Sequence, residues 1–188
     1  MGILDQIKGK LGNDGFKPNP AVLTHPEIPK PLHGLAPRVL LGKEWWDKER
    51  AEAKAKTGNR CLACGVYGFQ SSKGWLEGHE TYEIDYKKGI AVYVATIPLC
   101  PECHSFIHKG LLTVLEEKGE ISKVRKNEIL GRGYDLLKKA GIKPPLPYVG
   151  KCAEWEEWRL ILEGKVYLPF HKSYADWIDY YSEEPPDV

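Results

Sequence analysis

Two Cys-x-x-Cys pairs are the residues of this 188-residue chain whose types and spacing point most directly to chemistry. Cys61 and Cys64 form the first pair, and Cys100 and Cys103 form the second after an interval of 35 residues. Each pair presents two sulfurs from one tight turn, and four thiolates complete the tetrahedral shell of Zn²⁺. We therefore expect one structural zinc ion. The spacing leaves two alternatives open, namely four buried free cysteines or a redox pair.

The second cysteine pair runs directly into two histidines, His104 and His108. Four positions apart on a helix, two imidazoles lie on one face and can bind one metal ion. Between the cysteine pairs stands His79, which we expect to act as a general base toward water or as another ligand. Glu77 or Glu80 would bind a hard divalent ion or orient His79. The alternative is that these side chains only cap a helix and cover an exposed hairpin.

The elements that position these residues follow the order strand, strand, short helix. Residues 75–86 and 90–97 are predicted strands, because apolar and polar residues alternate in the first and a Lys-Lys-Gly turn separates the two. Pro101 suits the first turn of a helix that carries Cys103 and the two histidines. Further helices are predicted at 43–56, 122–140, 153–163 and 173–181.

The composition is that of a globular protein, with 42% hydrophobic and 28% charged residues. The formal net charge of +1 excludes a bulk polycation. Basic residues are nevertheless concentrated in 109–143, which contains nine Lys/Arg against five Asp/Glu, whereas 150–188 contains four against nine. The basic stretch either follows phosphates or forms a solvated helical face.

Cysteine usage and hydropathy indicate an intracellular, reducing environment. Five cysteines are an odd number, four of them stand in close pairs, and Cys152 stands alone, which we interpret as a buried or idle thiol. The first residues lack the apolar core of a signal peptide. No run of about 18 apolar residues exists, so we expect a cytoplasmic protein without a membrane partner.

Together these motifs resemble the HNH endonuclease family, and in particular its phage and bacterial subset. The family pattern is Cys-His-Glu-x-Trp followed by Leu-Cys-Pro-x-Cys-His-x-x-x-His. Residues 78–82 read Gly-His-Glu-Thr-Tyr, and residues 99–108 read Leu-Cys-Pro-Glu-Cys-His-Ser-Phe-Ile-His. The resemblance covers about 35–110. Ala95 stands where the family has a middle Asn, and Gly78 stands where it often has Asp or His.

The resemblance implies an α+β protein with a zinc-stapled ββα-metal centre and hydrolysis of phosphodiester bonds in DNA. His79 would take the place of the general base, and His104 and His108 would hold a divalent metal, with Glu80 as a further candidate ligand. That metal would be Mg²⁺, Mn²⁺, Ni²⁺ or a second Zn²⁺. It would polarise the phosphate and stabilise the leaving oxygen.

We expect three regions, which are a proline-rich extended arm at 1–40, the HNH-like zinc domain at 41–112 and a helical extension at 113–188. The alternative function is a catalytically inactive module of the same fold that grips nucleic acid or a protein partner; a purely structural component of a larger assembly is the third. A zinc deaminase is disfavoured because His79 and Glu80 are adjacent, and Glu83 excludes the His-Glu-x-x-His motif of metalloproteases.

Overall fold

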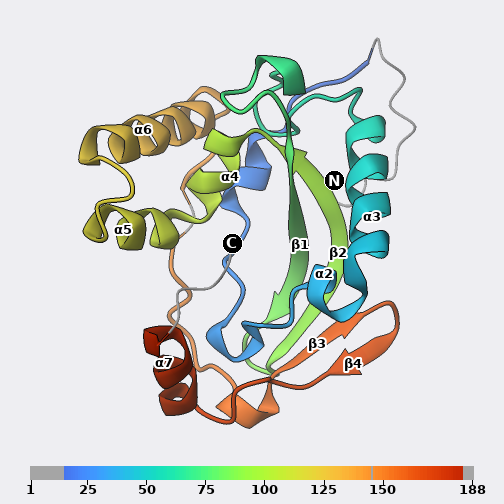
Figure 1. Ribbon diagram of the computed structural model, residues 1–188, viewed down its shortest axis with the longest axis vertical. Helices are drawn as coiled ribbons and strands as arrows, with labels where there is room; N and C mark the ends of the chain where they lie inside the picture. The colour runs from blue at the N-terminus through green and yellow to red at the C-terminus, as the bar shows by residue number, and fades with distance from the viewer. Residues whose placement is uncertain (1–14, 145, 184–188) are drawn as a thin grey trace. The chain divides into compact units, whose positions relative to one another are not determined.

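The structure is a computed structural model that describes residues 15–144 and 146–183. It confirms the α+β class, because the described residues form six α-helices, four short 3-10 helices and a mixed four-stranded sheet (Figure 1). The helices are α2 (Pro37–Leu40), α3 (Gly42–Lys56), α4 (Pro101–Ile107), α5 (Lys109–Glu117), α6 (Lys123–Lys139) and α7 (Tyr174–Glu183). The strands are β1 (Glu77–Asp85), β2 (Ile90–Leu99), β3 (Arg159–Leu162) and β4 (Lys165–Tyr167). The 3-10 helices are η1 (Pro20–Thr24), η2 (Lys30–Leu32), η3 (Gly68–Gln70) and η4 (Trp155–Glu157).

The described chain divides into two compact units, each with a core of its own. The first unit comprises residues 15–27, 47–80, 96–144 and 146. The second comprises residues 28–46, 81–95 and 147–183. The predicted strands are confirmed as β1 and β2, and each strand contributes one part to the first unit and the other part to the second.

The first unit packs η1, α4, α5 and α6 against one another (Figure 1), and buried residues of these elements form one core with the two cysteine pairs. The Ser122 side chain accepts a hydrogen bond from the Arg125 backbone N–H at 3.1 Å, which caps α6. Phe106 of α4 and Leu137 of α6 are 2% and 0% exposed, so these two helices share one core. The predicted helices at 43–56 and 122–140 are confirmed as α3 and α6.

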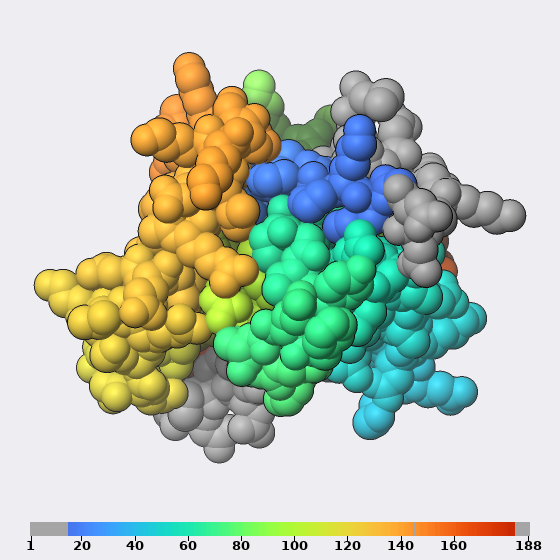
Figure 2. All heavy atoms as spheres, turned by 90° about the horizontal axis from the view of Figure 1, so that it is seen from above, coloured from blue at the N-terminus to red at the C-terminus, as the bar shows by residue number. Residues whose placement is uncertain are grey.

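The N-terminal segment of the first unit is packed against the region of the first cysteine pair. The Asn19 N–H donates to the Leu62 carbonyl at 2.7 Å, and Val22 and Leu23 of η1 are buried in the core. Figure 2 shows this segment in blue beside the turquoise and green residues that include that pair. Residues 1–14 of the predicted arm lie outside the described residues.

The second unit corrects the predicted helix at 153–163, which is wrong. The chain forms η4 and then β3, which pairs in parallel with β2 and antiparallel with β4. Trp158, Leu160 and Leu162 are buried at every second position, which is the period of a strand with one face in a core. Glu163 and Gly164 have φ of 50° and 72°, and they form the turn between β3 and β4. A glycine with positive φ is also a common end signal of helices, which explains the wrong prediction.

The last helix belongs to the second unit and contacts its N-terminal part. Ser173 caps α7 as predicted, because its hydroxyl oxygen accepts from the Asp176 N–H at 3.2 Å. The Trp177 indole N–H donates to His33 Nδ1 at 3.2 Å, and the Lys30 ammonium lies 4.8 Å from the centre of the Tyr174 ring. Residues 184–188 lie outside the described residues. No helix in the described ranges is both long and apolar enough to cross a membrane.

Two glycines of α6 have different reasons to be there. Gly131 is exposed, and a Cβ added to it would meet nothing within 4 Å. Gly133 is buried, and a Cβ added to it would overlap the ring of Phe106. The absent side chain at Gly133 therefore allows α6 to approach α4 closely, whereas Gly131 only weakens the helix.

The matched pair of alanine variants tests this packing. Gly133→Ala should lower the free energy of unfolding by roughly 1–3 kcal/mol, because the new methyl group displaces a buried ring. Gly131→Ala should raise it by about 0.5–1 kcal/mol through helix propensity. Urea denaturation of the two variants and the wild type gives both values. Equal changes in both variants would contradict the close approach of α6 to Phe106.

Candidate functional site

Local backbone hydrogen bonds place the first cysteine pair in a tight turn. The Cys61 N–H donates to the Val66 carbonyl at 2.8 Å, and the Gly65 N–H donates to the Cys61 carbonyl at 2.8 Å. Gly65 has φ of 80°, a conformation that glycine adopts without a steric penalty. The turn therefore directs Cys61 and Cys64 to the same side.

The second cysteine pair lies where β2 passes into α4. Cys100 is the N-cap residue of α4, Pro101 occupies the first turn and Cys103 lies within that turn. Cys61, Cys100 and Cys103 are buried, and Cys64 is partly buried. The fold thus brings the two predicted pairs together at the start of a short helix.

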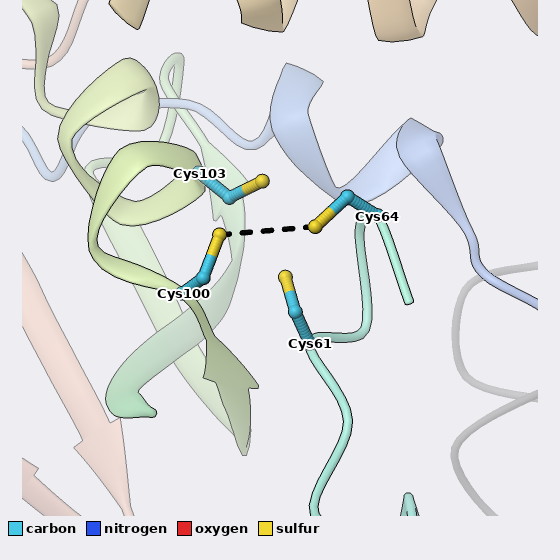
Figure 3. A group of neighbouring side chains, drawn as sticks. All are labelled: Cys61, Cys64, Cys100 and Cys103. Carbon is cyan, nitrogen blue, oxygen red and sulfur yellow. Dashed lines mark hydrogen bonds between the residues drawn. The ribbon is translucent and has the colours of Figure 1, made fainter. Parts of the chain in front are cut away.

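The four sulfurs form a compact group whose side chains point toward one another (Figure 3). The four Sγ atoms all lie within 4.8 Å of one another, and the Sγ atoms of Cys64 and Cys100 are 3.7 Å apart. In a tetrahedral site with Zn–S bonds of about 2.3 Å, neighbouring sulfurs lie about 3.8 Å apart. The group therefore fits a structural zinc ion.

Electrostatics favours a cation among the sulfurs. Hydrogen bonds from Cys100 and Cys103 lower the pKa of the Cys64 thiol, and the hydrogen bond with Cys100 raises the pKa of Cys103. Four thiols at this distance cannot all ionise without a compensating charge, which a bound Zn²⁺ supplies. The Arg132 guanidinium also lies 3.6 Å from Cys64 Sγ; burial lowers its pKa, but the neighbouring cysteine sulfurs raise it above the usual value.

The three predicted histidines converge in a second group. His79 comes from β1 and His104 from α4. His108 is the C-cap residue of α4 and the N-cap residue of α5, so the helix predicted to carry both histidines ends at His108. One ring nitrogen from each lies within 4.8 Å of the others. His79 Nδ1 and His108 Nε2 are 3.2 Å apart, close to the value of about 3.3 Å for two Zn–N bonds of about 2.05 Å in a tetrahedron.

A carboxylate orients one of these imidazoles. His104 Nδ1 lies 2.7 Å from Glu77 Oε2, and Lys73 donates to the other oxygen of Glu77 at 2.8 Å. Because Nδ1 of His104 faces Glu77, Nε2 is the nitrogen that can bind a metal. Glu80, the carboxylate we predicted as a ligand, lies partly buried on the same strand and is not a member of the three-histidine group found among the described residues.

Burial keeps His79 and His108 neutral. Desolvation, followed by the charges of His104, His108 and His25, lowers the pKa of His79 to about 2. Desolvation also lowers the pKa of His108 to about 4. The hydrogen bond from His104 lowers the pKa of Glu77 to about 2 against the opposing effect of burial. At neutral pH His79 and His108 therefore offer imidazole lone pairs near the Glu77 carboxylate anion, which suits a divalent cation.

One contact of this group was not predicted from the sequence. His25 Nδ1, from the predicted proline-rich arm, lies 3.4 Å from His79 Nε2 across 54 positions of the chain. Local spacing cannot reveal a pair so distant. Its only sign was that His25 precedes a proline and follows a short apolar run.

Part of the predicted basic stretch is engaged within the first unit. Arg125 pairs with Glu102 at 2.8 Å and with Glu128 at 3.2 Å, and Lys126 pairs with Glu116 at 2.7 Å. These cations hold α4, α5 and α6 together. Six further lysines of the stretch are exposed, namely Lys109, Lys118, Lys123, Lys138, Lys139 and Lys143.

No protein-family model, no curated protein and no solved structure matches the chain. The chemical interpretation therefore rests on two findings, the four-cysteine group and the three-histidine group. All five cysteines are unpaired, and Cys152 is exposed.

The four-cysteine group predicts one tightly held zinc ion. Cys61→Ser should lose that zinc and cooperative unfolding of the first unit, because a structural zinc contributes about 10–16 kcal/mol, as much as the whole stability of a domain. Cys152→Ser is the matched control and should retain both. Metal analysis after dialysis against a mild chelator, together with thermal unfolding, measures this. Equal zinc content in the two variants would refute the assignment.

The lowered pKa of His79 predicts a dependence of stability on pH. The unfolded imidazole gains a proton below its ordinary pKa of 6.5, whereas the folded one stays neutral down to about 2, so stability falls as pH falls through 6.5. Between pH 7 and pH 5 this loss amounts to about 2 kcal/mol for His79. His79→Gln removes it, so urea denaturation should show a flatter pH profile by that amount. Parallel profiles would show that His79 is not desolvated.

Proposed function

We propose that the protein is a metal-dependent endonuclease of the HNH type that hydrolyses phosphodiester bonds in DNA. The observation that supports this best is the convergence of His79, His104 and His108 within 4.8 Å. They come from a strand–strand–helix sequence whose two strands lie between the two cysteine pairs in the chain. The order of elements and the histidine positions agree with the ββα-metal pattern that the sequence resembles.

In this proposal the two groups have separate tasks. The cysteines hold a structural Zn²⁺ with all four positions filled by sulfur, which leaves no position for a substrate. The histidines supply only three ligands, so a metal bound there keeps open positions. Such a metal acts as a Lewis acid on a phosphate oxygen and lowers the pKa of coordinated water.

The donor atoms narrow the choice of the second metal. Three imidazoles suit Zn²⁺ or Ni²⁺, whereas Mg²⁺ prefers oxygen ligands. Glu77 contributes through its contact with His104, because a carboxylate behind a histidine fixes the ring and strengthens its donor nitrogen. We therefore propose Zn²⁺ or Ni²⁺ ahead of Mg²⁺ and Mn²⁺.

Within this proposal His79 has two candidate roles, general base and metal ligand. The sequence resemblance assigns it to proton abstraction, but its geometry supports a third metal ligand. His79 is only 4% exposed, and its Nδ1 lies 3.2 Å from His108 Nε2. A base with a pKa of about 2 also abstracts a proton poorly near neutral pH. We therefore propose His79 as a ligand.

The exposed lysines of α5, α6 and their neighbours supply the affinity for nucleic acid in this proposal. Lys123, Lys138 and Lys139 are exposed, and Lys109 follows His108 directly. Lysines contribute to DNA binding by neutralising phosphates without regard to sequence. Binding should therefore weaken steeply with added salt.

Plasmid nicking tests the proposal. Supercoiled DNA incubated at low salt with Zn²⁺, Ni²⁺, Mn²⁺ or Mg²⁺ should be nicked by the wild type and by Cys152→Ser. His104→Ala should abolish nicking through loss of a ligand, and Glu77→Gln should reduce it by roughly 10–100-fold. Agarose electrophoresis measures the initial rates.

Binding of a second metal equivalent by His79→Ala distinguishes the two possible roles of His79. Cleavage by the wild type distinguishes a nuclease from an inactive binding module. If His79 is a ligand, His79→Ala loses both the second metal and nicking; if it is the general base, the variant retains the metal and loses nicking. A wild type that binds DNA or a protein partner but cleaves with no metal would overturn the nuclease proposal in favour of an inactive binding module.

A further inference from the structure

We propose that His25 is a positioning residue that holds His79 in its Nε2–H tautomer and thereby turns the Nδ1 lone pair of His79 toward the metal-binding group. This inference rests on the proposed metal site for its function. Its structural basis lies in the first unit, which contains both residues. In the sequence, His25 lies well before the first cysteine pair and outside the interval between the two pairs.

The contacts of His79 divide between its two ring nitrogens. Nδ1 lies 3.2 Å from His108 Nε2, within the three-histidine group. Nε2 lies 3.4 Å from His25 Nδ1. The two nitrogens of an imidazole project away from each other, so the nitrogen that faces His25 is not the one that faces the other ligands. His25 is therefore an outer partner of His79 and not a fourth ligand.

A neutral imidazole carries its proton on only one nitrogen, and the hydrogen bond at one nitrogen decides which. If His25 Nδ1 accepts a hydrogen bond, His79 carries its proton on Nε2 and presents a lone pair at Nδ1. Without an acceptor there, the proton can occupy Nδ1, which then cannot bind a metal. His25 thus removes a competing tautomer before any metal arrives.

The same arrangement already exists for a second member of the group. His104 directs Nδ1 to Glu77 at 2.7 Å, which leaves Nε2 for the metal. His79 directs Nε2 to His25, which leaves Nδ1. Metal-binding histidines generally donate their other N–H to an acceptor, and loss of that acceptor typically costs 10–100-fold in affinity.

The backbone around His25 is held firmly enough to orient a ring. His25 is the C-cap residue of η1, and its N–H donates to the Val22 carbonyl at 3.2 Å. Val22 is 1% exposed, and the Thr24 hydroxyl donates to the Ala21 carbonyl at 2.7 Å. η1 also contacts α4, the helix that carries His104.

The experiment compares three variants of the full chain that has been loaded with one zinc equivalent at the cysteines. His25→Ala removes the acceptor. His25→Asn restores an oxygen near the position of Nδ1 and serves as the conservative variant. Thr24→Ala disturbs the same turn without removing the imidazole. Calorimetric titration with a second equivalent of Zn²⁺ measures affinity, and two-dimensional ¹H–¹⁵N NMR of the imidazole nitrogens reports the tautomer of His79 in the absence of added metal.

We expect His25→Ala to bind the second zinc roughly 10–100-fold more weakly. We expect the His79 signals to shift from the Nε2–H tautomer to a mixture. His25→Asn and Thr24→Ala should both stay within about threefold of the wild type. An unchanged tautomer in His25→Ala, or an equal loss of affinity in Thr24→Ala, would overturn the inference. A wild type that takes up no second metal would defeat the proposed function instead, and the tautomer measurement would still decide the role of His25.

Discussion

The grouping of the two cysteine pairs is the constraint on which the placement of the candidate metal ligands depends. It joins 61–64 to 100–103, and so it closes a loop that contains both strands of the hairpin. Closing such a loop costs entropy that local interactions alone recover only in part. Four Zn–S bonds would supply the difference, because the free energy of metal binding is free energy of folding. His104 directly follows Cys103, so the four-cysteine group also restrains the backbone of His104.

The histidine group makes the opposite contribution to stability. Three imidazoles brought to within 4.8 Å lose water, and their low pKa values record that loss for His79 and His108. The fold tolerates this cost because the cores around η1, α4 and α6 are well buried. In return His79 and His108 remain unprotonated at neutral pH, so protons compete weakly with a metal for these two rings. A local cost in stability of this kind, offset by packing elsewhere, is common where proteins bind ligands.

Short-range patterns in the sequence predicted the elements that carry the ligands. The cysteine spacing, the alternation in β1 and the position of Pro101 are local signals, and each element they indicate is present. The helix predicted at 153–163 is wrong because its apolar residues fit two periods, and the pairing of β3 with β2 decided between them. That pairing joins residues about 70 positions apart, which no local pattern records.

The contact between His25 and His79 was hidden for a related reason. Prolines exclude a long helix, and the expected extended arm gave no reason to place His25 beside His79. A chain of prolines is nevertheless compatible with 3-10 turns, and η1 buries Val22 and Leu23 in the core that contains the four cysteines. Burial of two apolar side chains contributes about 3–6 kcal/mol, enough to hold this segment in place. The histidine group and its His25 contact are thus assembled from three distant parts of the chain, so a metal bound at the histidines and docking of η1 would favour each other.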